Sequence, residues 1–173
     1  NSRLHDFKEE NYNTFAAKMA CAINHIYFWR KVIEADEPMA FLEHDAVCIG
    51  GWYNYKFEDY LLLNAETVFR RPNKLGLGQF KNYNFNGIGI CDFPKKYPLT
   101  YHKHNEWWDA NMAPGTGAYA ISPSGAKKML AAVEKYGIDQ SDFMINSFNV
   151  RMQYITPSLA KFNKVNLSTS YGT

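Results

Sequence analysis

A short, mainly apolar run over residues 39–43 follows Pro38 directly. It ends in Glu43, the first of two carboxylates, and the second, Asp45, comes two residues later. Proline disfavours helix in the residue before it, so the run is separated from any helix upstream. Side chains at i and i+2 of an extended segment share a face, which predicts that Glu43 and Asp45 point together from the end of a buried strand. Such a pair needs a positive partner, and Mg²⁺ holding phosphates is one. A solvated acidic turn is the alternative.

Helical patterns stand on both sides of this run. Apolar residues at three- and four-residue steps predict a helix from about residue 14 to residue 37, capped by Asn13 or Thr14, after a loop over residues 1–13. Ser122 as N-cap and Pro123 as first helical residue open a second helix, which Gly137 ends. A third, short helix is expected from a cap at residues 141–142 to about residue 148.

Short apolar runs predict strands at residues 39–43, 60–63, 117–121 and 152–156, and residues 64–114 read as long loops with a short strand near 87–91. Helices that alternate with short strands favour an α/β layered domain. In open α/β sheets, ligands bind beyond the carboxyl ends of the strands, and Glu43 and Asp45 lie at such an end.

Size and charge narrow the class of protein. A chain of 173 residues with 46% hydrophobic and 21% charged residues suits one domain over residues 1–173. A net charge of +2 gives little support for a nucleic-acid or membrane-surface partner. Three widely spaced cysteines argue against a disulfide framework, so an intracellular, cytoplasmic location is expected. No apolar stretch approaches the roughly 20 residues of a membrane span.

Three segments in order carry a resemblance to a known family. They are residues 21–25 followed by Trp29, residues 41–46, and residues 114–122 leading into a helix and then Asp139 and Asp142. This order resembles glycosyltransferase family 25, which includes lipopolysaccharide-modifying transferases and collagen galactosyltransferases. The resemblance covers roughly residues 18–145.

The resemblance implies a GT-A-like nucleotide-binding sandwich with a mixed central sheet flanked by helices. It also implies a divalent metal, Mn²⁺ or Mg²⁺, that holds the diphosphate of a nucleotide sugar, most consistent with a UDP-linked donor. Carried onto this chain, Glu43 and Asp45 are the metal pair, and the metal acts as a Lewis acid on the leaving diphosphate. Asp142 or Asp139 is the general base for the acceptor hydroxyl.

Four further residues are implied in donor binding by the same resemblance. Gly115, Thr116 and Gly117 would bring backbone N–H groups close to a phosphate or sugar, although a tight turn before a strand is the commoner use of such a sequence. His25 lies in a helix of apolar period, where a structural role is the alternative to a role in the site.

The chain departs from the family pattern at His44, where the family has Asp, and at Asn24, where it has Ser. Residues 1–13 do not resemble the hydrophobic strand with which the family begins, so that strand is expected to be lacking. The expected function is sugar transfer to a hydroxyl of a glycan or related acceptor. Two alternatives stay open: a catalytically silent domain that binds a nucleotide or glycan, and a phage-type transferase that acts on modified DNA bases.

Overall fold

A five-stranded mixed sheet organises the chain. The computed structural model describes residues 9–67, 85–93, 107, 110–113 and 115–162. The strands, in spatial order, are β1 (Met39–Leu42), β5 (Ala118–Ile121), β3 (Tyr60–Leu62), β6 (Met152–Thr156) and β4 (Gly89–Asp92). Only the β3–β6 pair is parallel, and the others are antiparallel. The α/β class with a mixed central sheet, predicted from the sequence, is confirmed.

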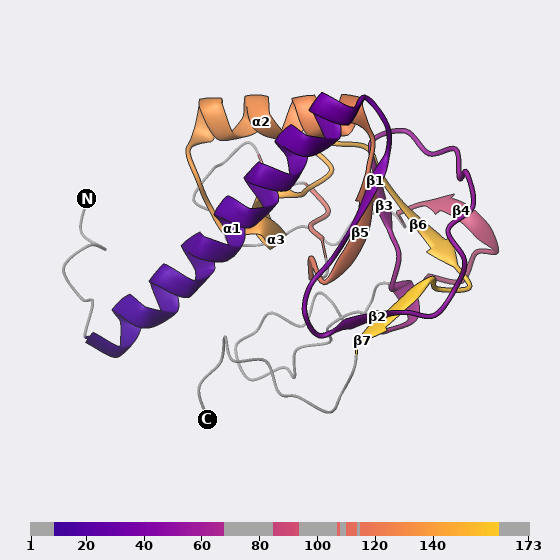
Figure 1. Ribbon diagram of the computed structural model, residues 1–173, viewed down its shortest axis with the longest axis horizontal. Helices are drawn as coiled ribbons and strands as arrows, with labels where there is room; N and C mark the ends of the chain where they lie inside the picture. The colour runs from indigo at the N-terminus through magenta and orange to yellow at the C-terminus, as the bar shows by residue number, and fades with distance from the viewer. Residues whose placement is uncertain (1–8, 68–84, 94–106, 108–109, 114, 163–173) are drawn as a thin grey trace.

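The helices α1 (Glu9–Ala35), α2 (Pro123–Tyr136) and α3 (Ser141–Met144) cover one face of this sheet (Figure 1). Alternation along the strands explains the arrangement, since successive side chains point to opposite faces. Tyr60 and Leu62 of β3 pack in the core on the helical side, whereas Leu61 packs in a second core on the other side. The centre of the sheet, at β3, is therefore buried on both faces.

A small second sheet covers the other face. It pairs β2 (Ala46–Cys48) with β7 (Ala160–Phe162) in antiparallel register, beside a single 3₁₀ turn, η1 (Ala65–Thr67). The sequence analysis did not predict these strands. Each has three residues, and β2 is largely exposed, so neither carries a readable apolar alternation.

The second helix follows the prediction closely. The Ser122 hydroxyl accepts a hydrogen bond from the Gly125 N–H at 3.0 Å, Pro123 is the first helical residue, and Gly137 ends the helix at φ 79°. Gly137 also donates its N–H to the Val133 carbonyl, as glycine C-caps do.

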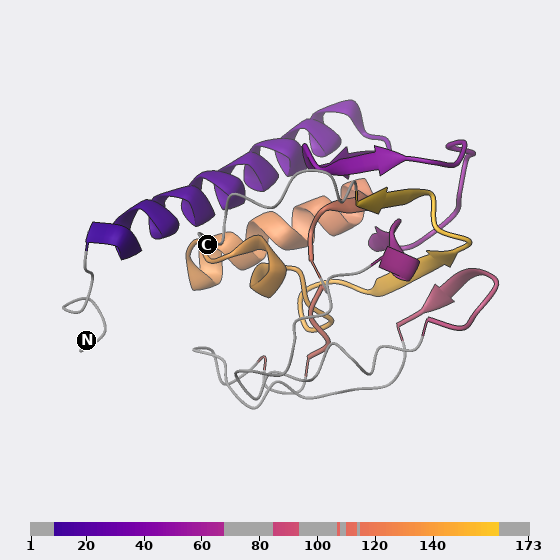
Figure 2. The same cartoon turned by 90° about the horizontal axis from the view of Figure 1, so that it is seen from below.

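The other helix boundaries differ from the prediction. Helix α1 begins at Glu9, so the expected loop is wrong over residues 9–13, and Asn13 and Thr14 lie inside the helix instead of capping it. Its first turns extend beyond the sheet (Figures 1 and 2). Helix α3 ends at Met144, well before residue 148, and its N-cap is Gln140. No helix among the described residues has the length and hydropathy needed to cross a membrane.

Candidate functional site

One face of α1 presents polar side chains to the sheet at four-residue intervals. Residues four apart lie above one another on a helix, and Cys21, His25 and Trp29 follow this spacing. His25 and Trp29 are completely buried and Cys21 is half-buried. The His25 ring also contacts Phe41 of β1, at 4.3 Å between ring centroids. Helix α1 and the end of β1 are thereby held against each other.

Glu43 is the first residue after β1. Its N–H donates to the Gly117 carbonyl at 2.8 Å, and its own carbonyl accepts from the Ala46 N–H at 3.0 Å. Residues 43–46 thus form a hydrogen-bonded turn, which corrects the expectation that Glu43 and Asp45 belong to an extended segment with alternating faces. Asp45 lies within the turn, and its Oδ1 atom is buried without a hydrogen-bond partner among the described residues.

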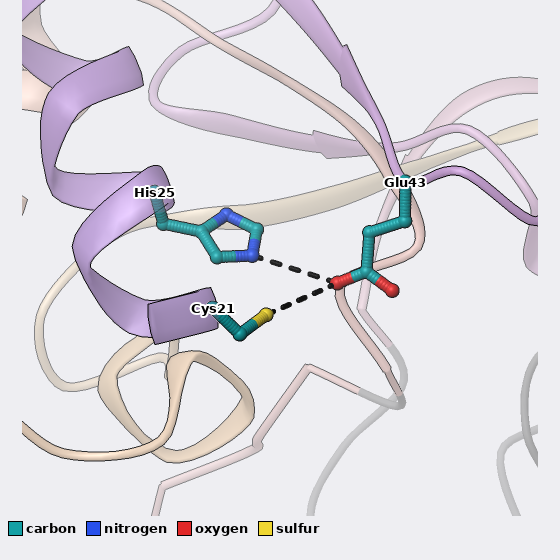
Figure 3. A group of neighbouring side chains, drawn as sticks. All are labelled: Cys21, His25 and Glu43. Carbon is teal, nitrogen blue, oxygen red and sulfur yellow. Dashed lines mark hydrogen bonds and ion pairs between the residues drawn. The ribbon is translucent and has the colours of Figure 1, made fainter. Parts of the chain in front are cut away.

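The Glu43 carboxylate points toward α1 (Figure 3). Its Oε1 atom lies 3.6 Å from His25 Nε2 and 3.7 Å from Cys21 Sγ. Thr116 donates its hydroxyl to the same oxygen at 3.0 Å. The Thr116 contact is an ordinary hydrogen bond, whereas the separation from His25 exceeds hydrogen-bond length.

Protonation in this cluster follows from burial and charge. Burial alone would raise the pKa of Glu43. Interactions with His25, and hydrogen bonds from Thr116 and Cys21, outweigh burial and hold that pKa below its ordinary value of 4.5. Burial, together with the nearby charge of Glu43, raises the pKa of the Cys21 thiol to about 11. At neutral pH the site therefore holds an ionised Glu43 beside a protonated thiol.

On the side away from Glu43, buried aromatic residues are hydrogen bonded to His25. Trp29 Nε1–H donates to the Tyr119 hydroxyl at 3.1 Å, and that hydroxyl is hydrogen bonded to His25 Nδ1 at 2.8 Å. Burial raises the pKa of Tyr119 well above its ordinary value, so the phenol keeps its proton. Tyr119 belongs to β5, and its contacts fix the orientation of the imidazole, with Nε2 facing Glu43.

Thr116 joins the two halves of the site. Besides Glu43, its Oγ1 atom lies 3.1 Å from Asp142 Oδ1 and 3.1 Å from Ser141 Oγ. A hydroxyl has one proton, so Thr116 donates to one of the two carboxylates at a time, while Ser141 is able to donate to Thr116. The sequence analysis selected four residues in separate segments, and in the structure they meet in one cluster: His25, Glu43, Thr116 and Asp142.

The other predicted site residues lie around this cluster. Gly115 has φ 98°, a conformation that favours glycine. Gly117 has a packing reason to be glycine, since a Cβ atom there would overlap the Phe162 ring. Asp139 Oδ1 accepts the Gln140 N–H at 2.8 Å, at the start of α3. The contact with Thr116 favours Asp142 over Asp139 as the acid nearest Glu43.

The sequence analysis did not select Cys21, Tyr119 or Ser141 as site residues. The signal for Cys21 was its four-residue spacing from His25. It was passed over because the three cysteines are widely spaced and were considered as possible disulfide partners. Tyr119 alternates with small residues in a buried strand, a pattern that indicates core packing, and no local pattern marks Ser141.

Comparison with known proteins adds the family. Residues 6–145 match the family model described as Glycosyltransferase family 25 (LPS biosynthesis protein). No curated protein matches the chain at a significant level. The matched range contains the whole cluster, from Cys21 to Asp142.

Proposed function

The chain belongs to glycosyltransferase family 25, and we propose that it transfers a sugar from a nucleotide-sugar donor, most consistent with a UDP-linked hexose, to a hydroxyl group of a glycan acceptor. The family description makes a lipopolysaccharide precursor the first acceptor to test. The observation that carries the proposal is the meeting of Glu43, Thr116 and Asp142 beyond the end of β1.

In this proposal Asp142 is the general base that takes the proton of the acceptor hydroxyl. It is the acid that shares the Thr116 hydroxyl with Glu43, which supports a position close to the donor side of the site. Asp139 is the second candidate for this role. Thr116 is a positioning residue, because its hydrogen bonds fix Glu43 and Asp142 relative to each other.

The turn after β1 fits the divalent cation that the family implies. The buried Asp45 Oδ1 atom has no hydrogen-bond partner among the described residues, which is costly unless a positive group meets it. Mg²⁺ is usually held by one or two carboxylates together with phosphate oxygens, so Glu43 and Asp45 are a sufficient protein contribution. When bound, Mn²⁺ or Mg²⁺ would neutralise charge on the departing nucleoside diphosphate.

The segment 115–117 would bind the donor through its backbone. Gly115 lacks the Cβ atom that would keep a phosphate or sugar away, whereas the space beside Gly117 is filled by the Phe162 ring, and Thr116 between them is already committed to the carboxylates. His25 is completely buried behind Glu43. Its role in the proposal is therefore to hold Glu43 and not to contact the donor directly.

The test combines nucleotide binding with turnover. Thermal unfolding of the wild type is followed with UDP or GDP, each with and without Mn²⁺, and donor consumption is measured with a panel of glycan acceptors. A ligand at 100 times its Kd stabilises by about 2.7 kcal/mol. We expect a Mn²⁺-dependent shift with UDP that Asp45→Asn abolishes, and turnover that Asp142→Asn abolishes without loss of the shift.

The matched control is Glu34→Gln, which alters an exposed carboxylate on α1 that pairs with Lys31. It should change neither the shift nor turnover. Binding without turnover on every acceptor would favour the catalytically silent domain instead. No shift with any nucleotide, in the presence or absence of Mn²⁺, would contradict the proposed donor site.

A further inference from the structure

We propose that Cys21, His25 and Glu43 form a binding site for a transition-metal ion such as Zn²⁺, which differs through its Cys21 and His25 ligands and its chemistry from the cation that would hold a donor diphosphate. One sulfur, one nitrogen and one oxygen from these residues lie within 4.8 Å of one another (Figure 3). The inference does not depend on the transferase activity.

The spacing of the three ligand atoms fits a metal better than a hydrogen-bond network. In a tetrahedral zinc site with ordinary bond lengths, nitrogen and oxygen ligands are about 3.4 Å apart and sulfur and oxygen ligands about 3.6 Å apart. The observed separations from Glu43 Oε1 are 3.6 Å to His25 Nε2 and 3.7 Å to Cys21 Sγ. An N–H···O contact of 3.6 Å is too long for a hydrogen bond.

The His25 Nε2 atom is a second, independent observation. It is buried without a hydrogen-bond partner among the described residues, although the other ring nitrogen is hydrogen bonded to Tyr119. A buried polar atom without a partner needs an explanation, and an ion that the coordinates do not contain is one. Ligating histidines commonly have their second nitrogen held by a hydrogen bond, as Tyr119 holds Nδ1 here.

The ligand types select the kind of ion. A thiolate and an imidazole suit Zn²⁺ and its neighbours in the transition series, whereas Mg²⁺ and Mn²⁺ prefer oxygen ligands. Cys21 is a thiol in the metal-free protein, so metal binding would release its proton to solvent. Three protein ligands leave a fourth position for water or another oxygen.

Glu43 is able to take part in both sites because its two oxygens face different ways. Oε1 faces Cys21 and His25, and Oε2 points away from them (Figure 3). Asp45 has no part in the Cys21–His25–Glu43 set. Replacement of Asp45 should therefore separate the two sites experimentally.

The experiment uses Co²⁺ as a spectroscopic substitute for Zn²⁺. The full chain is reduced, stripped with a chelator, and titrated with Co²⁺ without nucleotide, and Zn²⁺ affinity is then measured by competition. We expect one ion per chain, with a thiolate-to-cobalt charge-transfer band and the intense visible bands of a four-coordinate ion. Tyr119→Phe, which removes the hydroxyl bonded to His25 Nδ1 and to Trp29 Nε1, should weaken Zn²⁺ binding about 10- to 100-fold.

The variants separate this site from other binding. Cys21→Ser should abolish the charge-transfer band, whereas Cys48→Ser, at an exposed cysteine, should leave it unchanged. Asp45→Asn should keep the band while losing the Mn²⁺-dependent nucleotide shift.

Two outcomes would overturn the metal site. One is a wild-type titration with no thiolate band at stoichiometric Co²⁺, which needs no variant to fold. The other is equal Zn²⁺ affinity in Cys21→Ser and Cys48→Ser. Failure of the nucleotide shift alone would count against the proposed function and not against this site.

Discussion

Thr116 contacts more acceptors than its single hydroxyl proton is able to serve. Glu43, Ser141 and Asp142 all lie within 3.1 Å of its Oγ1 atom, and the residue is buried. The hydroxyl lowers the cost of bringing two carboxylates together, because it donates to one while Ser141 is able to donate to it. A methyl group in the same place would remove this hydrogen bond from both carboxylates.

Thr116→Val should therefore destabilise the fold by about 1–3 kcal/mol, the usual cost of removing one partner from a buried polar group. We also expect a loss of turnover that is larger than any loss of nucleotide binding. Thr116→Ser, which keeps the hydroxyl, is the matched control and should remain close to wild type. Urea unfolding and steady-state kinetics measure the two effects, and equal stability of the two variants would contradict the role of the hydroxyl.

Glu43 predicts how stability depends on pH. Its pKa is lower in the folded protein than its ordinary value of 4.5, so below that value the unfolded chain binds more protons than the folded one. Its contribution to stability is thus complete above about pH 4.5 and is lost as pH falls through the folded pKa. In the presence of a chelator, Glu43→Gln should show a shallower loss of unfolding free energy below this pH. An unchanged slope would contradict the pKa shift.

Individual residues could be predicted from the sequence where a local pattern indicates their role. Glu43 stood out because two carboxylates at the end of a buried strand need a positive partner, and Asp142 was selected through the resemblance to the family. Their relation to Thr116 depends on two hydrogen bonds, one to Glu43 across 73 residues of sequence and one to Asp142 across 26. No local pattern encodes contacts over such separations. A turn after the strand was the alternative to an extended acidic pair, and the extended segment was preferred because the same apolar run is compatible with a longer strand.

At the level of elements, helix α2 and strands β1, β3, β5 and β6 were predictable because each has a strong local signal. Ser122, Pro123 and Gly137 mark both ends of α2, and the strands are short apolar runs. Strands β2 and β7 depend on pairing with each other, and the pairing joins residues 46–48 to residues 160–162. Tertiary context alone determines them.

The close approach of the segment before β5 to β7 gives a stability prediction at the level of elements. Gly117 lies just before β5, and a Cβ atom there would overlap the ring of Phe162 in β7. Gly117→Ala should therefore destabilise the fold by about 1–3 kcal/mol through overpacking. Combining it with Phe162→Ala removes the obstacle, so the double variant should be more stable than the sum of the two single effects predicts. Additive effects in urea unfolding would contradict the proposed overlap.

At the scale of the whole molecule, the two ends of the sheet differ. Glu43 lies beyond the last residue of β1, whereas Asp59 precedes the first residue of β3 at the opposite end, because both strands are antiparallel to β5. Asp59 is buried and accepts hydrogen bonds from Lys128 at 2.5 Å, from the Arg151 N–H at 2.9 Å and from Ser124 at 3.2 Å. It therefore ties β3, α2 and β6 together away from the candidate site.

Asp59→Ala should cost about 2–4 kcal/mol, since it leaves a backbone N–H and a hydroxyl without their acceptor. Asp92→Ala is the matched control, because Asp92 is exposed and pairs with the exposed side chain of Arg151. Exposed pairs contribute about 0–1 kcal/mol, so this variant should be nearly as stable as wild type. UDP with Mn²⁺ should still raise the lower unfolding temperature of Asp59→Ala, and loss of that shift would contradict the separation of the two ends.

The order of the strands has a consequence for local opening. Strand β1 is the last strand on its side of the described sheet and has a ladder with β5 alone, whereas β3 has ladders on both sides. An end strand opens by breaking one ladder, so its amides should exchange with solvent deuterium faster than those of β3. Glu43 follows this strand, and its own N–H bonds the Gly117 carbonyl. The carboxylate therefore follows an end strand that opens more readily than β3. A bound donor should slow amide hydrogen exchange in β1 more than anywhere in β3.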